Sequence, residues 1–351
     1  MRNLRTICAV SLSALAVWHI LQVPEDTSLL DQANSNGAPL DFSNHKIKGA
    51  AMMLISKPWT QRRGERQCYF NRSMDLLATN WYPHNSYPII LQHPQGFTPQ
   101  EQTDIQQKWP HLPLYFSNVG HAFNDGQQIP SPMQDEDKPM APLGYKKMCA
   151  FKTYGFLQAP HVQELDYMVY LDDDSCLTEP IRYDVFSKMK QHKIVYAYKQ
   201  LFLDRANVVR GLEEFVQTFQ QQHNIQKVAN PELAQWLETN GYKAGKSHWS
   251  FGTNLEWVDL RQYQKPSLLK FHHAIRDSGM IFHRRWGDAP LRFVLAYLFW
   301  DATQVMRICT EYVHSHWKPS PSSCTDDGQN PRIQNAVLAQ LQRCQGKAYC
   351  D

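Results

Sequence analysis

The sequence predicts an α/β fold with a mostly parallel central sheet flanked by helices, following an N-terminal membrane anchor. Short apolar runs alternate with helical patterns through the first half of the chain, as in sheets whose parallel strands are connected by helices. One run, 167–171, leads directly into three aspartates, Asp172, Asp173 and Asp174. In open parallel sheets ligands bind at the carboxyl ends of the strands, so this triplet marks the expected site.

Periodicity and turn residues give the expected elements in chain order. Short apolar runs predict buried strands at 50–55, 87–91, 114–116 and 167–171. Amphipathic patterns predict helices at 72–80, 100–108, 148–157, 186–192, 212–223 and 290–301. Residues 119–142 are rich in Gly, Pro, Asp and Gln and are expected to form a long loop, and 283–288 a polar turn.

The composition fits a globular domain with a sizeable core. The chain has 351 residues, of which 42% are hydrophobic and 12% aromatic, and its formal net charge is +3. It contains no basic block and no long acidic tail. A nucleic-acid partner is therefore not expected.

The N-terminal segment predicts a membrane anchor. Residues 7–23 are almost uncharged, Arg2 and Arg5 precede them, and Glu25 and Asp26 follow. Because positive charge stays in the cytoplasm, we expect a single span with the N-terminus inside. A cleaved signal peptide is the alternative, since the Ala-Leu-Ala sequence within the run resembles a cleavage signal.

This anchor divides the chain into four expected parts. Residues 1–6 form a cytoplasmic tail, 7–23 the anchor, 24–46 a polar stem, and 47–351 a luminal domain. The cysteines show no CxxC pair, so a zinc site is not expected. Disulfides are permitted in the lumen. Candidate pairs are Cys309 with Cys324, or Cys344 with Cys350.

The aspartate triplet has the chemistry of a cation site. Carboxylate oxygens are the ligands that Mg²⁺ and Mn²⁺ prefer, and these ions commonly bridge a protein to substrate phosphates. The alternative is a solvated acidic turn. The apolar run before Asp172 favours the site.

Glu256 is the second candidate, since it lies in an aromatic stretch that begins at Trp249. A carboxyl group in such surroundings is either paired or kept neutral. It could act as a base, as a nucleophile or as an acceptor for sugar hydroxyls. The alternative is an acid on a surface helix that pairs with Arg261 or Lys265.

The block from Arg284 to Pro290 combines cations, an aromatic residue, a glycine and an acid. Arginine binds phosphate through paired hydrogen bonds, so Arg285 is a candidate for binding the cofactor phosphates. Asp288 could accept hydrogen bonds from sugar hydroxyls. Alternatively, Asp288 caps the helix that begins near Pro290.

Two histidines, His314 and His316, alternate on an apparently extended segment and so face the same side. Histidine binds Mn²⁺ alongside carboxylates, and a structural role is the alternative. His272 and His273 are less persuasive as ligands, because adjacent residues of a strand point in opposite directions.

Several blocks occur in the order typical of one enzyme family. They are Lys147–Phe151, Tyr183–Phe186, Asn254–Glu256, Arg285–Pro290 and Tyr312–His314. Through these blocks, over roughly residues 48–325, the chain resembles the yeast-type α-1,2-mannosyltransferases of glycosyltransferase family 15. The Arg-Trp-Gly-Asp-Ala-Pro block that starts at Arg285 is the most specific of them.

The resemblance implies a GT-A-like nucleotide-sugar-binding fold and a retaining transfer of mannose from GDP-mannose, with Mn²⁺ as cofactor. The acceptor is a glycan on protein or lipid, and the expected linkage is α-1,2. The resemblance also implies a single-pass type II protein of the Golgi membrane with a luminal catalytic domain. A retaining transferase with a UDP-hexose donor and an inactive glycan-binding luminal protein are the alternatives.

The resemblance also implies roles for single residues. The family's Glu-Pro-Asp tripeptide falls on the triplet, so Asp172 and Asp174 are the expected metal and diphosphate ligands, with His314 as the metal-binding histidine. Glu256 matches the candidate nucleophile, which either forms a covalent intermediate or stabilises an oxocarbenium-like state. Asp288 matches the acid at the donor sugar. The chain departs from the family at Asp173, where the family has Pro.

Overall fold

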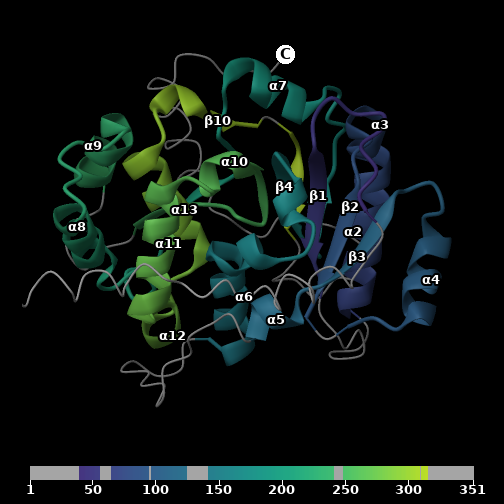
Figure 1. Ribbon diagram of the computed structural model, residues 1–351, viewed down its shortest axis with the longest axis horizontal. Helices are drawn as coiled ribbons and strands as arrows, with labels where there is room; N and C mark the ends of the chain where they lie inside the picture. Colours follow the sequence, from purple (N-terminus) through teal and green to yellow (C-terminus); the bar gives the residue numbers. More distant parts are fainter. Residues whose placement is uncertain are drawn as a thin grey trace, which may run out of the picture. The chain divides into compact units, whose positions relative to one another are not determined.

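The computed structural model describes residues 39–55, 65–94, 96–124, 141–240, 248–308 and 310–314. A seven-stranded sheet in the order β10-β6-β9-β4-β1-β2-β3 forms the centre of this part (Figure 1). Its strands are β1 Gly49–Leu54, β2 Ile89–His93, β3 Leu114–Asn118, β4 Tyr167–Asp172, β6 Tyr196–Tyr198, β9 Leu255–Asp259 and β10 Val305–Arg307. β9 runs antiparallel to both of its neighbours, whereas every other pair is parallel. The predicted mostly parallel sheet is confirmed.

Helices pack on both faces of this sheet, and two short strand pairs lie beside it. The helices are α2 Glu65–Asn80, α3 Tyr82–Asn85, α4 Pro99–Lys108, α5 Gly120–Asn124, α6 Leu143–Thr153, α7 Val185–His192, α8 Leu212–Gln222, α9 Pro231–Asn240, α10 Leu260–Tyr263, α11 Pro266–Ser278, α12 Met280–Arg284 and α13 Asp288–Phe299. The short antiparallel pairs are β5 Ser175–Leu177 with β11 Tyr312–His314, and β7 Leu201–Asp204 with β8 His248–Phe251.

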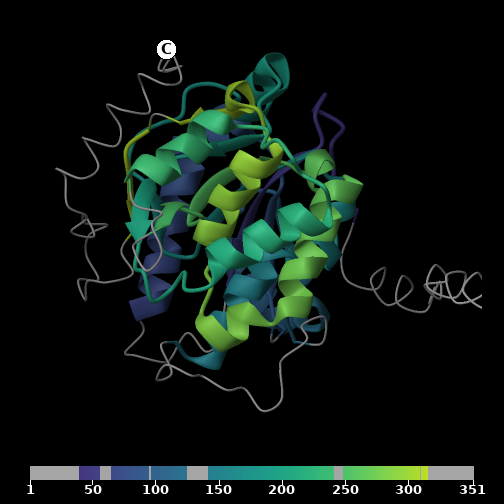
Figure 2. The same ribbon diagram turned by 90° about the vertical axis from the view of Figure 1, so that its left-hand side faces the viewer.

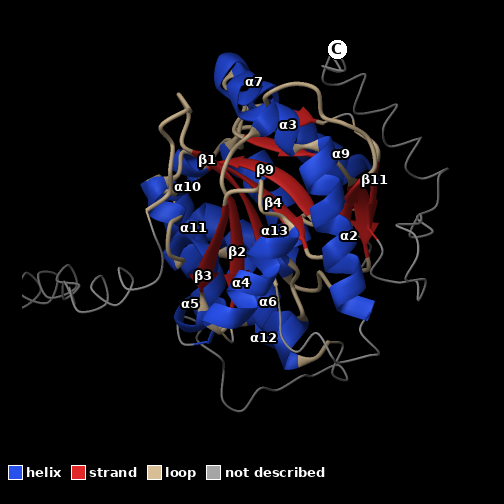
Figure 3. Ribbon diagram, turned by 90° about the vertical axis from the view of Figure 1, so that its right-hand side faces the viewer, coloured by secondary structure: helices blue, strands red, loops and turns tan. Residues whose placement is uncertain are grey.

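The pleat of the strands divides the core in two. Side chains alternate along β1, so that Met53 joins one cluster and Met52 the other. Helices α2 and α7 cover the Met53 face, and α6, α11 and α13 cover the Met52 face. The two groups lie on opposite sides of the strands (Figures 1 and 3).

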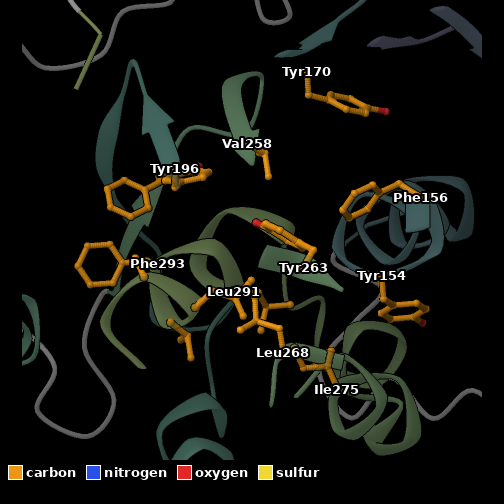
Figure 4. Close-up of a cluster of buried hydrophobic side chains, with 14 of the residues drawn as sticks. Tyr154, Phe156, Tyr170, Tyr196, Val258, Tyr263, Leu268, Ile275, Leu291 and Phe293 are labelled. Carbon is orange, nitrogen blue, oxygen red and sulfur yellow. The ribbon is translucent and has the colours of Figure 1, made fainter. Parts of the chain in front are cut away.

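The Met52 face is rich in aromatic residues. Tyr196 of β6 and Tyr263 of α10 lie in one cluster with Tyr170 of β4 (Figure 4). Tyr196 stacks on Trp300 with ring centroids 5.4 Å apart, and Tyr263 lies edge-on to Phe156 at 5.7 Å. Helix α13 is buried along most of its length, because it packs against β8 as well as against α6 and α9. Figure 2 shows the helices on this side of the molecule.

Most predicted strands match the structure, and the differences have local causes. The strand expected at 87–91 begins at Ile89, because Pro88 has no N–H for the ladder. The helix expected at 148–157 is α6, which starts at Leu143 directly after Pro142. The long loop expected over 119–142 is wrong at its start, since α5 forms there, and residues 125–140 lie outside the described part.

The chain already packs against the domain before residue 47. Leu40 is 7% exposed and belongs to the core, and the Asp41 N–H donates to the Tyr115 hydroxyl at 3.1 Å. The expected tail, anchor and first part of the stem, residues 1–38, lie outside the described residues. In the part that the structure describes, no helix has the length and apolar character needed to cross a membrane.

A cysteine outside the two candidate pairs forms a disulfide. Cys176 on β5 is disulfide-bonded, whereas the sequence suggested pairs only among later cysteines. Those four cysteines, Cys309, Cys324, Cys344 and Cys350, lie outside the described residues. Cys149 on α6 is a free, buried thiol.

Buried His272 should make the stability of the fold depend on pH. It lies on helix α11 rather than on the strand that the sequence suggested, and it stacks on Tyr263. Neither of its ring nitrogens has a hydrogen-bond partner within the described residues. Burial, assisted by Arg292, lowers its pKa from 6.5 to about 3. The neutral ring therefore stabilises the fold above pH 6.5, and this contribution is lost as the pH falls toward 3.

We expect the contribution of His272 to the free energy of unfolding to be about 2 kcal/mol smaller at about pH 5 than at about pH 7. The reason is that the unfolded histidine takes up a proton over this range, whereas buried His272 does not. Urea unfolding of the wild type and of His272→Phe at both pH values measures it, and the variant should lose less stability on acidification. The exposed His273→Phe on the same helix is the matched control. Parallel pH profiles for wild type and His272→Phe would contradict the assignment.

Candidate active site

The aspartate triplet lies where the sheet ends. β4 stops at Asp172, Asp173 and Asp174 form the turn, and β5 begins at Ser175. The Ser175 hydroxyl accepts from the Asp172 N–H at 3.1 Å and donates to the Asn254 carbonyl at 2.6 Å. Strand β4 is thereby tied to β9 at the turn, which fixes the direction of the acids.

Strand pairing brings His314 to this turn. β11 pairs antiparallel with β5, and His314 lies opposite Ser175. The His314 Nε2 atom is 2.9 Å from Asp174 Oδ1 and 3.7 Å from Asp172 Oδ2. One ligand atom from each of the three residues lies within 4.8 Å of the others. The partner histidine suggested by the sequence, His316, lies outside the described residues.

This cluster fits a divalent cation. Ligand atoms that share one Mg²⁺-sized ion lie roughly 3 to 4 Å apart, given bond lengths near 2.1 Å. Two carboxylates and an imidazole form a ligand set that suits Mn²⁺. Asp172 is 29% exposed in its side chain, so the cluster is open on one side. The geometry therefore allows a metal that also contacts a substrate.

Glu256 is on a strand, and the surface-helix alternative is wrong. It lies on β9 opposite Tyr170, with 0% exposure. Its partner is Arg292 of α13, whose Nε donates to Glu256 Oε2 at 3.0 Å, and the Tyr196 hydroxyl donates to the same oxygen at 2.9 Å. Arg261, one of the partners expected from the sequence, instead binds Asp259 at 2.7 Å. Glu256 is thus held in a buried ion pair with Arg292.

Asp288 is the first residue of α13, one residue after the N-cap position. The N-cap is Gly287, and no side chain caps the helix, so the cap alternative is wrong. Asp288 is 5% exposed. Its Oδ2 atom has no hydrogen bond within the described residues and lies 3.5 Å from the Lys152 ammonium.

Lys152 was missed by the sequence reasoning. It lies at the end of α6 with 3% exposure, and its ammonium donates to Asp172 Oδ1 and to the Thr253 carbonyl, both at 2.8 Å. Burial lowers the pKa of Lys152, but attraction to Asp172 and Asp288 outweighs it, and the pKa is raised. The available signal was a lysine directly after the buried run from Cys149 to Phe151.

Arg285 has an unusual backbone conformation and does not contact the acid cluster. Its φ of 65° lies in the left-handed region, which disfavours residues other than glycine. Its guanidinium lies 4.9 Å from the centre of the Tyr145 ring and donates to the Tyr145 hydroxyl at 3.1 Å. Strain of this kind is often found at functional sites. The phosphate-binding role of Arg285 stays a prediction.

Three polar residues and Leu54 lie level with one another across the sheet, and we call this set the polar row. By strand register, Asp172 of β4 is level with Leu54 of β1, Gln92 of β2 and Ser117 of β3. Both amide atoms of Gln92 and the hydroxyl of Ser117 are buried and lack hydrogen-bond partners in the described part. Such groups commonly await a ligand or water.

The sheet order and the acid cluster at the end of β4 define an α/β protein of the glycosyltransferase type. Core-mannan synthase A (CmsA/Ktr4) from Aspergillus fumigatus, solved in an Mn/GDP form, superimposes with a TM-score of 0.67 at 19% identity, over 86% of each chain. Ktr4p from Saccharomyces cerevisiae, solved with GDP, gives a TM-score of 0.67 at 18% identity, over 92% of each chain. These likenesses show the fold.

The chain belongs to the glycolipid 2-alpha-mannosyltransferase family, whose model matches residues 72–327. The resemblance found in the sequence is thereby confirmed. Relatives from Saccharomyces cerevisiae include the probable mannosyltransferase KTR4, 27% identical over 66% of this chain, and the alpha-1,2 mannosyltransferase KTR1, 27% identical over 46%. The chain spans 54% and 41% of the lengths of these two relatives.

Proposed function

We propose that this protein is a retaining glycosyltransferase that moves mannose from GDP-mannose to a glycan acceptor and forms α-1,2 linkages. The observation that carries the proposal is the cluster of Asp172, Asp174 and His314 at the sheet edge of a chain in this family. The solved neighbours with GDP, one of them with Mn as well, agree with such a donor. The acceptor is a glycan on protein or lipid.

The three cluster residues are the proposed ligands of Mn²⁺. When bound there, the ion would stabilise the negative charge of the departing diphosphate. Asp172 and Asp174 thereby also position the diphosphate, and the guanidinium of Arg285 is available to a phosphate oxygen once it leaves Tyr145.

The nucleoside is proposed to extend along the polar row. The cluster lies at one end of this row, and the polar atoms of Gln92 and Ser117, which have no hydrogen-bond partner in the described part, are buried two and three strands away. Adjacent strands are roughly 4.8 Å apart, so the row has the length of a nucleoside diphosphate.

The sugar of the donor is proposed to contact Asp288 and to be stabilised electrostatically by Glu256. Asp288 Oδ2 has no hydrogen bond within the described residues and can accept one from a sugar hydroxyl. Glu256 supplies negative charge below the reacting carbon. Because Arg292 and Tyr196 hold its carboxylate, the contacts favour stabilisation of an oxocarbenium-like state over covalent attack.

The proposal extends to the cellular setting. Residues 7–23 are proposed to anchor the protein in the Golgi membrane, with the catalytic domain in the lumen. The disulfide at Cys176 supports an oxidising compartment.

A panel of nucleotide sugars tests the donor. In the presence of Mn²⁺, GDP-mannose at about 100 times its Kd should stabilise the protein by about 2.7 kcal/mol, by mass action. UDP-glucose and UDP-galactose should shift the melting temperature far less, and EDTA should remove the shift. A larger shift with a UDP-hexose would favour the alternative donor, and stabilisation by a free glycan alone would favour the inactive binding protein.

A further inference from the structure

Lys152 lies between the proposed metal ligand Asp172 and the buried acid Asp288. Its ammonium has three N–H groups and is enclosed, with 3% exposure. Two of them are used at 2.8 Å, on Asp172 Oδ1 and on the Thr253 carbonyl. The third side of the ammonium faces Asp288 Oδ2 at 3.5 Å. One cation thus contacts carboxylates from two different parts of the proposed site.

The two carboxylate oxygens of Asp172 have different partners. Oδ1 accepts from Lys152, whereas Oδ2 is the oxygen that faces His314. A carboxylate that is held in this way offers one oxygen to a metal instead of two. Lys152 therefore restricts how Asp172 can bind an ion.

Asp288 depends on the same cation. A buried carboxylate without compensation is costly, and Asp288 Oδ2 has no hydrogen bond in the described part of the chain. The nearby ammonium provides its charge compensation while leaving the oxygen free to accept from a substrate hydroxyl.

The position of Lys152 is itself fixed by its surroundings. Its ammonium lies 4.7 Å from the centre of the Tyr170 ring, on the strand that ends at Asp172. Its carbonyl accepts from Arg292 Nη2 at 2.7 Å, and Arg292 forms the ion pair with Glu256. Lys152 is thus held in place through both its backbone carbonyl and its ammonium group.

We propose that Lys152 is a positioning residue, whose ammonium holds Asp172 as a one-oxygen metal ligand and keeps Asp288 aligned for the donor. The inference rests on the proposed metal site. With the divalent ion bound and no donor present, the formal charges of Asp172, Asp174, Asp288, Lys152 and the ion would sum to zero. Lys152 also repels the ion that Asp172 binds, so it limits the affinity for the metal in return for a defined geometry.

The test replaces the ammonium and measures the metal directly. Lys152→Met keeps an unbranched side chain on Tyr170 but removes the charge. With less repulsion and both Asp172 oxygens released, we expect Mn²⁺ to bind about threefold to tenfold more tightly. Binding is read from the loss of the free Mn²⁺ signal in electron paramagnetic resonance. Turnover with GDP-mannose should fall about 30-fold or more, mainly in kcat, because Asp172 and Asp288 lose their alignment.

Two further variants keep this test decisive. Lys147→Met makes the same change on the same helix, where the ammonium donates to Asn124 Oδ1 at 2.9 Å, and it should leave Mn²⁺ affinity unchanged. If Lys152→Met does not fold, Lys152→Met with Asp288→Asn removes the uncompensated carboxylate and should still bind Mn²⁺ more tightly.

The possible results distinguish the positioning role of Lys152 from the proposed metal site and function. A wild type that binds no Mn²⁺ would remove the proposed metal site. A wild type that binds Mn²⁺, with equal or weaker binding by the Lys152 variants, would overturn the positioning role and leave the proposed function standing.

Discussion

Replacing Asp174 by Asn is expected to lower mannosyl transfer about 1,000-fold, because a ligand of the ion that stabilises the leaving diphosphate is lost. Asp174 Oδ1 is the closest carboxylate oxygen to His314 Nε2, at 2.9 Å. His314→Ala should have a similar effect. Steady-state rates with GDP-mannose at saturating and limiting Mn²⁺ measure it, and higher Mn²⁺ should recover part of the activity.

The triplet provides a matched control. Asp173→Asn makes the same change at the neighbouring residue, which is not among the three cluster residues. It should reduce transfer much less than Asp174→Asn. Equal losses for the two variants, or a His314→Ala enzyme with normal Mn²⁺ dependence, would contradict the assignment of the ligands.

The second large effect is expected at Glu256. Glu256→Gln removes the anion beneath the proposed sugar site and leaves Arg292 buried without its counter-charge. We expect a loss of about 3–5 kcal/mol in the free energy of unfolding. We also expect a fall in transfer of about 100-fold or more, because the charge that stabilises the reacting sugar is gone.

A paired variant separates these two consequences. Glu256→Gln with Arg292→Gln leaves no unpaired charge at this place, so most of the stability should return. Transfer should remain as low as in the single variant. Urea unfolding and transfer rates, measured on the same preparations, make the comparison. Recovery of both properties would show that Glu256 serves only to hold Arg292.

Local sequence patterns were enough to predict much of the fold. The residues before Asp172 form a continuous apolar run because β4 is buried on both faces of the sheet. This run predicted the strand, and the acids that follow it were therefore expected at the strand's end. Helix α4 was also predicted from its local pattern, and in the structure Thr98 and Glu101 form a capping box at its start. Such signals depend on neighbours in the chain.

The remaining features depend on contacts between distant segments. No local pattern shows that Arg292 on α13 pairs with Glu256 on β9, so an exposed helix remained an alternative for that glutamate. Lys152 looked like an ordinary helical lysine, and only the packing of α6 against the end of β4 places it on Asp172. His314 could be suggested as a ligand, but the β5–β11 pairing was needed to bring it to Asp174.

The most direct test of the central claim is transfer by the purified protein to a mannoside acceptor. The account predicts that GDP-mannose with Mn²⁺ gives an α-1,2-linked mannosyl product with the anomeric configuration retained, and that EDTA abolishes the reaction. Transfer from a UDP-hexose but not from GDP-mannose, or transfer that is indifferent to chelation, would contradict it.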